Sequence, residues 1–375
     1  MSDLRPAARL PILLLGMLSL VGGVLAGLAR LAWEVPAVAA ASAGGHGALM
    51  ISAFFGTVIS LERAVAIGRR WAYLAPAAAG AGGVALLAGA PLGLAQTLAG
   101  AAAVVMVAAS VQVLRRLVAP FTVVLALGAL CWLIGNLAWL ASGAVNAAVP
   151  WWLAFLVLTI AGERLELSRF LPTPAAARRI FFVIVGMIVG GALLSLLAAD
   201  AGLRLFAAGL VALALWLLRF DIAWHNARRD GLPRFIAICL LAGYAWLALD
   251  GVLGLAGGFD PGHPLRDSTL HAVGLGFVFS MVFGHAPIIF PAVARVKIPY
   301  HPAFYLPLLV LHASLLLRVA GGVSGAFALR REGGLANACA LLLFIATMLI
   351  SVIRGRAAGT KNRVKVKEAI HGQRY

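Results

Sequence analysis

Long apolar runs separated by short polar or basic stretches occupy almost the whole of this 375-residue chain. A membrane hydrocarbon layer about 30 Å thick needs roughly 20 apolar residues per crossing helix, because an α-helix rises about 1.5 Å per residue. Runs of this kind cover residues 10–33, 46–67, 72–93, 95–117, 121–142, 150–170, 178–199, 202–224, 234–256, 268–290, 302–322 and 336–354. The sequence therefore predicts an all-α polytopic membrane protein of about twelve transmembrane helices, with residues 10–354 as one transmembrane domain.

The composition agrees with this class of protein. Apolar residues make up 63% of the chain and charged residues 11%, against roughly half and a quarter in soluble domains. The net charge of +17 lies in short loops between apolar runs rather than on one soluble face, which excludes nucleic acid as a partner and leaves the lipid bilayer. Each of the three cysteines lies inside an apolar run, so any metal has to be bound by histidine or carboxylate.

The distribution of Lys and Arg predicts the orientation of the chain. With the N-terminus inside, 24 of the 30 basic residues fall on cytoplasmic loops or tails. The six exceptions are Arg30, Arg204, Arg266, Arg318, Arg330 and Arg331. We therefore expect a multi-pass protein of a bacterial-type inner (plasma) membrane with both termini cytoplasmic. Residues 1–9 form its N-terminal tail and residues 355–375 a basic C-terminal tail, which we expect to be irregular from Thr360 to Tyr375.

A short motif recurs near the cytoplasmic end of three apolar runs. The sequences are ISLERAVAIG at 59–68, TIAGERLELSRF at 159–170 and MVFGHAPIIF at 281–290. The second, sixth and tenth runs thus correspond to one another, which indicates units of about four helices. The sequence predicts a pseudo-threefold arrangement of three such units.

Two histidines lie at the outer ends of the second and tenth runs. His46 stands in AGGHGALM and His271 in STLHAVGLGF, and both runs are even-numbered, so both histidines lie at the same depth. The neighbouring glycines are Gly44, Gly45, Gly47, Gly274 and Gly276. Glycine gives the clearance that a flat macrocycle needs, and two neutral imidazoles from different helices can hold a haem iron. The sequence predicts haem b bound by His46 and His271; the alternative is that each imidazole bonds a backbone carbonyl at a helix end.

Two further histidines lie within apolar runs and are candidate ligands of a second metal. His285 follows His271 by fourteen residues, which in an α-helix returns to almost the same face about 21 Å farther along, so one metal cannot bind both. His312 lies near the middle of the eleventh run, where it is either a ligand or a hydrogen-bonded packing residue. A bound copper would need further ligands, for which the sequence gives no support.

Charged side chains within the apolar runs are costly and usually functional. Glu62 and Arg63 end the second run, and Glu163 and Arg164 end the sixth, at the cytoplasmic depth of His285. We expect the glutamates to pair with arginines; the competing hypothesis is a proton path. Asp250, in the ninth run, is a further candidate for such a path.

This pattern resembles the catalytic subunit of haem-copper oxidases, which has twelve helices in three arcs and holds low-spin haem by histidines of its second and tenth helices. It also resembles NnrS-type membrane proteins associated with nitric-oxide stress, which have a histidine opening an early helix and an HAxxxG stretch in a late one. The matching residues are His46 in GHGALM and His271 in HAVGLG. The sixth and seventh runs contain no histidine, so a complete binuclear haem-copper centre is not expected.

The resemblance implies a haem-binding membrane protein that acts in electron transfer or in handling nitric oxide or a similar diatomic gas. Such a protein could be a haem-dependent oxidoreductase, and it would work with a redox partner or within a respiratory complex. The alternative is a proton-coupled transporter of a small molecule that contains no haem. In that case the buried carboxylates and His285 would carry the coupled protons.

Overall fold

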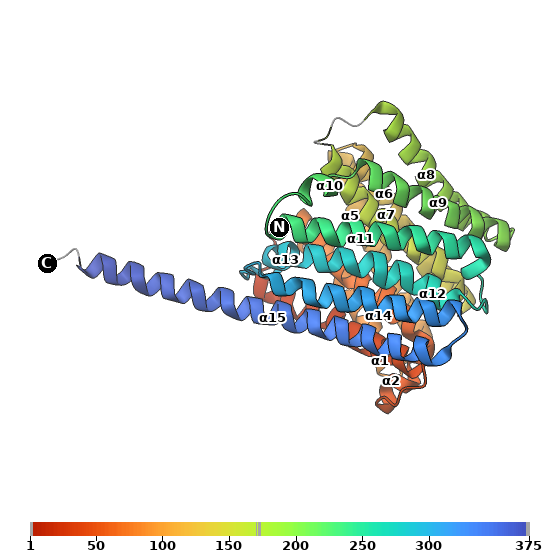
Figure 1. Cartoon of the computed structure of the whole chain (residues 1–375), viewed down its shortest axis with the longest axis horizontal. Helices are drawn as coiled ribbons and strands as arrows, with labels where there is room; N and C mark the ends of the chain where they lie inside the picture. Colours follow the sequence, from red (N-terminus) through yellow and green to blue (C-terminus); the bar gives the residue numbers. More distant parts are fainter. Residues whose placement is uncertain (1–2, 170, 172–173, 373–375) are drawn as a thin grey trace.

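The computed structural model describes residues 3–169, 171 and 174–372, with side chains as far as Gly355, and contains helices and loops without any strand in that part of the chain. Its main helices are α1 (Pro6–Ala29), α3 (Gly56–Ile67), α4 (Leu74–Leu87), α5 (Leu92–Arg116), α6 (Pro120–Ser142), α7 (Val145–Ser168), α8 (Ala175–Leu194), α9 (Ala199–Phe220), α11 (Leu232–Leu253), α12 (Arg266–His271), α13 (Ser280–Ala294), α14 (Tyr305–Val323) and α15 (Phe327–Gly372). The short helices are α2 (Ala37–Ala41), α10 (Ala223–Asn226), and the 3-10 turns η1 (Ala43–Gly45), η3 (Arg70–Tyr73) and η6 (Pro302–Phe304). The long helices lie side by side in one bundle (Figure 1).

Within the described residues, eleven helical stretches are long and apolar enough to cross a membrane. The predicted class, an all-α polytopic membrane protein, is therefore confirmed. The difference from the twelve expected spans lies at 72–93, where α4 has only 14 residues and follows the 3-10 turn η3.

Although α4 is short, it is one of the helices whose directions alternate from one to the next along the chain. A Cβ added to Gly80 would meet Leu15 of α1, and one added to Gly22 of α1 would meet Leu87. Residue numbers therefore increase in the same direction along α1 and α4, so the two helices are parallel and packed closely together. In the described part of the chain, α4 and the eleven longer stretches together make twelve passes through the bundle. The N- and C-terminal ends of the described chain lie on the same side of it (Figure 1).

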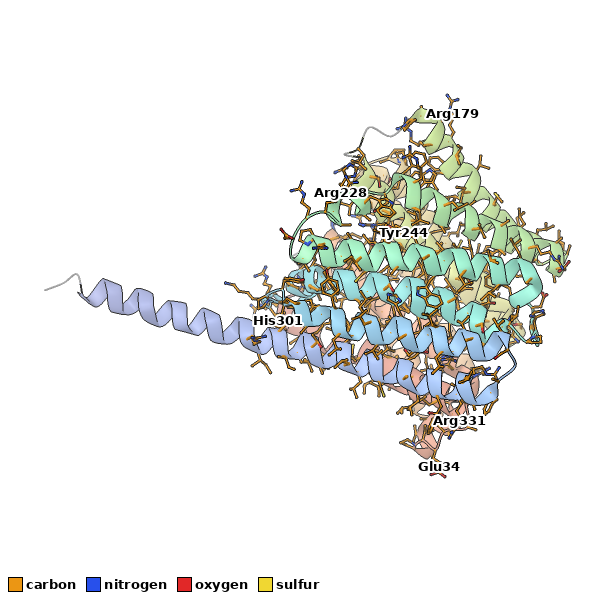
Figure 2. The ribbon with its side chains drawn as sticks, viewed as in Figure 1. Glu34, Arg179, Arg228, Tyr244, His301 and Arg331 are labelled. Carbon is orange, nitrogen blue, oxygen red and sulfur yellow. The ribbon has the colours of Figure 1, made fainter. Side chains whose placement is uncertain are left out.

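The positions of individual loop residues follow the same alternation. Figure 2 places Arg228 and His301 at one end of the bundle, and Glu34 and Arg331 at the other. The first pair lies on predicted cytoplasmic loops and the second on predicted outer loops. Which end faces the cytoplasm stays a prediction from the distribution of basic residues.

Both ends of the chain are more ordered than the sequence predicted. Helix α1 begins at Pro6, and the buried guanidinium of Arg9 donates hydrogen bonds to the carbonyl oxygens of Leu4 and Val293, so residues 3–9 are tied to the bundle. At the other end, the backbone of α15 continues as a helix to Gly372 and extends beyond the bundle (Figure 1). The expected irregular tail is therefore wrong as far as residue 372.

Three stretches are π-helical, with wider turns than an α-helix. They are η2 (Ala48–Phe55), η4 (Gly254–Gly258) and η5 (Ala272–Phe279). η2 begins two residues after His46, and η5 begins directly after His271. The two candidate ligand histidines thus precede the same rare local structure, which is frequent at functional sites.

Candidate functional site

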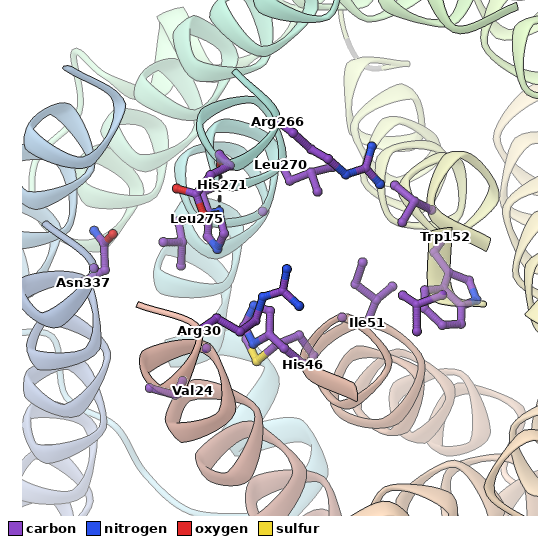
Figure 3. A pocket seen from close by; sticks show the side chains of 18 of the residues that line it. Val24, Arg30, His46, Ile51, Trp152, Arg266, Leu270, His271, Leu275 and Asn337 are labelled. Atoms are coloured by element: carbon purple, nitrogen blue, oxygen red, sulfur yellow. Dashed lines mark hydrogen bonds and ion pairs between the residues drawn. The ribbon is translucent and has the colours of Figure 1, made fainter. Parts of the chain in front are cut away.

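The structure brings His46 and His271 together in one space between α1, η2 and α12 (Figure 3). Their ring centres are 6.0 Å apart and their ring planes differ by 21°. The predicted proximity of these two residues, which are 225 positions apart in the sequence, is confirmed. The haem that they were predicted to hold stays a prediction.

Hydrogen bonds fix the orientation and the tautomer of both rings. Nδ1–H of His46 donates to the carbonyl oxygen of Gly23 at 2.7 Å, and Nδ1–H of His271 donates to the carbonyl oxygen of Asp267 at 2.8 Å. A carbonyl oxygen can only accept, so Nδ1 carries the proton and Nε2 keeps a free lone pair. Each imidazole therefore does bond a backbone carbonyl, as the alternative interpretation predicted. This bond does not exclude a ligand role, because it leaves Nε2 of each ring free to bind a metal.

The spacing of the two rings suits one metal atom between them. With Fe–N bonds of about 2 Å and each ring nitrogen about 1 Å from its ring centre, imidazoles on opposite sides of an iron have centres about 6 Å apart. The observed 6.0 Å agrees with this separation. The near-parallel ring planes and the 6.0 Å separation also lie within the range of offset-stacked aromatic rings.

Helix α1 approaches His46 closely because residue 27 is glycine. A Cβ at Gly27 would lie 2.8 Å from Cε1 of His46 and 2.9 Å from its Nδ1. Any larger residue would push the ring away from the carbonyl of Gly23, which is four residues earlier on the same helix. Gly27 therefore sets the position of the imidazole.

Both histidines line a cavity of about 650 Å³, within the roughly 300–1,000 Å³ of small-molecule and cofactor sites. Its inner walls are apolar and include Val24, Met50, Trp152, Leu275 and Leu341. Its polar lining consists chiefly of Arg30, Asn146, His263, Arg266, Asp267 and Arg318. The cavity is thus apolar along most of its walls and carries cationic groups among its few polar ones.

Glycines leave room on the cavity side of the histidines, as the sequence suggested for most of them. A Cβ at Gly44, Gly45 or Gly274 would have no atom within 4 Å, and Gly44 and Gly274 line the cavity. Gly276 has a different role, because a Cβ there would collide with the ring of Trp246. Gly276 therefore serves helix packing rather than access to the cavity.

Three arginines of the cavity were not recognised as functional from the sequence. Arg266 donates to Asn146 at 2.9 Å and to the carbonyl oxygen of Phe259, and Arg318 forms an ion pair with Asp267. Arg30 has no hydrogen-bond or ion-pair partner among the described side chains and extends into the cavity (Figure 3). All three belong to the six basic residues that fall outside the predicted cytoplasmic loops. Their unusual position was the sequence feature from which a role in the site could have been inferred.

His285 and His312 lie apart from this pair. Nδ1–H of His285 donates to the carbonyl oxygen of Met281 at 2.8 Å, and Nδ1 of His312 accepts from Nε1–H of Trp246 at 2.9 Å. No group of three or more His, Cys, Asp or Glu side chains in the described part of the chain could hold a metal ion. Neither residue therefore has the partners that a second metal site would need.

The expectation that His285 returns to the helix face of His271 assumed an unbroken α-helix between them. Eight of the intervening residues instead form the π-helix η5, whose turns are wider than those of an α-helix. The helix face of His285 therefore does not follow from a count of 3.6 residues per turn.

The carboxylates at the predicted cytoplasmic depth do not form the expected bridges. Glu62, Arg63 and Arg164 are charged neighbours of Glu163, so the second and sixth predicted helices do bring these groups together. Among the described side chains, however, no salt bridge joins either glutamate to an arginine. Asp250 is fully buried, and neither carboxylate oxygen has a hydrogen-bond partner in the described part of the chain.

Comparison with known families assigns the chain to a family. The model of a family described as a domain of unknown function, DUF8744, matches residues 9–353. Because this range covers nearly the whole sequence, the chain belongs to that family. No curated protein matches the chain. The resemblance to NnrS-type proteins and haem-copper oxidases stays a prediction.

Proposed function

We propose that this chain is a haem-binding integral membrane protein in which His46 and His271 would hold one haem b through their free Nε2 atoms. The observation that carries the proposal is the pair of imidazoles 6.0 Å apart in one cavity, each with its proton on Nδ1 and a free Nε2. Two neutral imidazole nitrogens are one of the ligand sets that can hold a haem iron.

The rest of the cavity suits the remainder of a haem. Apolar walls suit the porphyrin faces, and the open space beside Gly44 and Gly274 leaves room for a flat ring. The two propionates of haem b need cationic partners, for which Arg30 and Arg266 are available in the cavity lining. In the predicted orientation these groups face the outer side of a bacterial-type inner membrane.

A haem with two histidine ligands supplies one-electron transfer. The residues of this chain would hold it, orient both imidazoles through Nδ1, and keep water from most of its surface. Electron transfer to a redox partner or a respiratory complex is therefore the function we propose. Handling of nitric oxide or another diatomic gas is the other chemistry that a haem held here would supply.

A visible spectrum of the detergent-purified protein tests the proposal. We expect a Soret band and the spectrum of low-spin haem b, and we expect His46→Ala and His271→Ala each to remove or convert that same signal. His285→Ala and His312→Ala are matched controls that should leave it unchanged.

A wild-type protein without haem after expression in haem-sufficient cells and after addition of hemin would contradict the proposal. So would folded His46→Ala and His271→Ala proteins with unchanged low-spin spectra. In either case a proton-coupled transporter becomes the better interpretation, and transport assays on Asp250→Asn and Glu163→Gln would follow.

A further inference from the structure

The imidazole of His271 lies beside a carboxylate, whereas the imidazole of His46 does not. Asp267 lies one helical turn before His271 on α12, and its Oδ1 is 3.4 Å from Nδ1 of His271, in addition to the 2.8 Å bond from Nδ1–H to its backbone carbonyl. Among the described residues, Nδ1 of His46 has a hydrogen bond to the carbonyl oxygen of Gly23 and no ion pair with a carboxylate. The two imidazoles are therefore electrostatically unequal.

The carboxylate of Asp267 is itself held by an arginine from another helix. Nε of Arg318, on α14, donates to Oδ2 at 2.8 Å, and its Nη2 donates to Oδ1 at 2.7 Å. Both oxygens are thus engaged by the planar fork of one guanidinium, which fixes the carboxylate in direction as well as in distance. Arg318 is only 7% exposed, so water screens the pair weakly.

Close helix packing keeps Arg318 in place. A Cβ at Gly333 of α15 would lie 2.6 Å from the backbone nitrogen of Arg318, and one at Gly322 of α14 would collide with the hydroxyl of Ser268 on α12. The three helices can approach only because these positions are glycine. The ion pair therefore belongs to a rigid contact between α12, α14 and α15.

We propose that Asp267 and Arg318 are positioning residues for His271, and that their ion pair sets the electron density at its free Nε2. The inference rests on the proposed haem. A carboxylate beside Nδ1–H raises the basicity of the imidazole, and a ligand histidine usually has such a partner. Arg318 cancels part of this negative charge at the cavity wall.

Removing the charge of Asp267 and removing that of Arg318 should shift the midpoint potential of the haem in opposite directions. In Asp267→Asn the negative charge is lost while the backbone carbonyl stays, so the oxidised iron is less stabilised and the midpoint potential rises. In Arg318→Gln the carboxylate loses its counter-charge, so the oxidised iron is more stabilised and the potential falls. The double variant restores neutrality, and its potential should lie between those of the single variants.

The test is a redox titration of the low-spin haem band in wild-type protein and these three variants. Asp200→Asn and Arg204→Gln are matched controls, because that Asp–Arg pair lies 2.8 Å apart on the exposed face of α9 and does not line the cavity. Controls should keep the wild-type potential. Arg318→Lys keeps the charge without the fork, so it should restore much of the potential but broaden the low-spin spectrum.

The outcomes separate this inference from the proposed function. If wild-type protein binds no haem, both are overturned. If it binds haem through His46 and His271, but Asp267→Asn and the double variant keep the wild-type potential, only the positioning role is overturned. If Arg318→Gln fails to fold, the midpoint potential of Asp267→Asn is compared with that of the charge-neutral double variant instead. Equal potentials in these two variants would overturn the role of Arg318.

Discussion

Replacing Gly274 by alanine should separate the stability of the protein from its affinity for the cofactor. Gly274 lies three residues after His271 in η5, lines the cavity, and has no atom within 4 Å of the position of an added Cβ. In haem-free protein the new methyl group meets nothing. Because alanine restricts the unfolded chain more than glycine does, Gly274→Ala should stabilise the haem-free fold by about 0.4–1 kcal/mol.

With haem in the cavity the same methyl group occupies space that the ligand needs. Overpacking by one methyl or methylene group costs about 1–3 kcal/mol. Since about 1.4 kcal/mol corresponds to a factor of ten in a binding constant, haem should bind about 5- to 150-fold more weakly. The two effects have opposite signs, which makes the variant diagnostic.

The assay combines thermal unfolding of haem-free protein with a hemin titration followed at the Soret band. Gly190→Ala is the matched control, because Gly190 is a half-buried helical glycine of α8 with no atom near its Cβ position and no place in the cavity lining. It should show the same stabilisation and an unchanged affinity. Equal haem affinity in both variants would refute the placement of haem beside Gly274, and a destabilised haem-free Gly274→Ala would refute the open space itself.

Gly191→Ala should destabilise the fold by about 1–3 kcal/mol, because its Cβ would overlap the α9 backbone. The adjacent Gly190→Ala should not destabilise it. Thermal unfolding of both variants in detergent measures the difference. Arg30→Ala should weaken haem binding by up to about fivefold, because an exposed ion pair contributes up to about 1 kcal/mol to the binding free energy. The low-spin spectrum should not change. In the control variant Arg204→Ala, a hemin titration should give the wild-type affinity. Burial and a hydrogen bond to a carboxylate raise the pKa of Tyr73 from 10.0 to about 12, so its contribution to stability is complete below pH 10 and is lost as the pH rises to 12. Wild-type protein should therefore lose more stability than Tyr73→Phe over that range in alkaline unfolding experiments.

The class of the protein, all-α and polytopic, followed from apolar length, because crossing a membrane imposes a length that any sequence must satisfy. The stretch 72–93 was harder to predict. Its Ala- and Gly-rich residues are apolar throughout, so hydropathy did not show where the 3-10 turn η3 gives way to α4 or where α4 ends at Leu87. The tight contact of α4 with α1 depends on small residues on both helices, which hydropathy does not register.

The pairing of His46 with His271 could be predicted because depth and helix parity place both imidazoles at one level. The arginines of the cavity could not be assigned in the same way, since the distribution of charges was used only to find the orientation. Arg30, Arg266 and Arg318 were counted as exceptions, although a cation on the less favoured side of a membrane itself indicates a specific role.

The direction of His285 could not be obtained from spacing. Residue counting assumes 3.6 residues per turn, and nothing in the letters AVGLGFVF shows that residues 272–279 adopt the wider π-helical turn. The bridges expected at Glu62 and Glu163 failed for a related reason. Adjacent Glu and Arg in one helix point about 100° apart, so each pair needs the neighbouring helix to bring the opposite charge within reach.

The 225 residues between the two histidines also affect the biosynthesis of the protein. At about 5–20 residues per second, His271 leaves the ribosome roughly 11–45 seconds after His46. During that interval the early helices enter the membrane with only half of the ligand pair. Any ligand held by both imidazoles can therefore be loaded only after the tenth crossing has been inserted, and its arrival marks completed insertion of most of the chain.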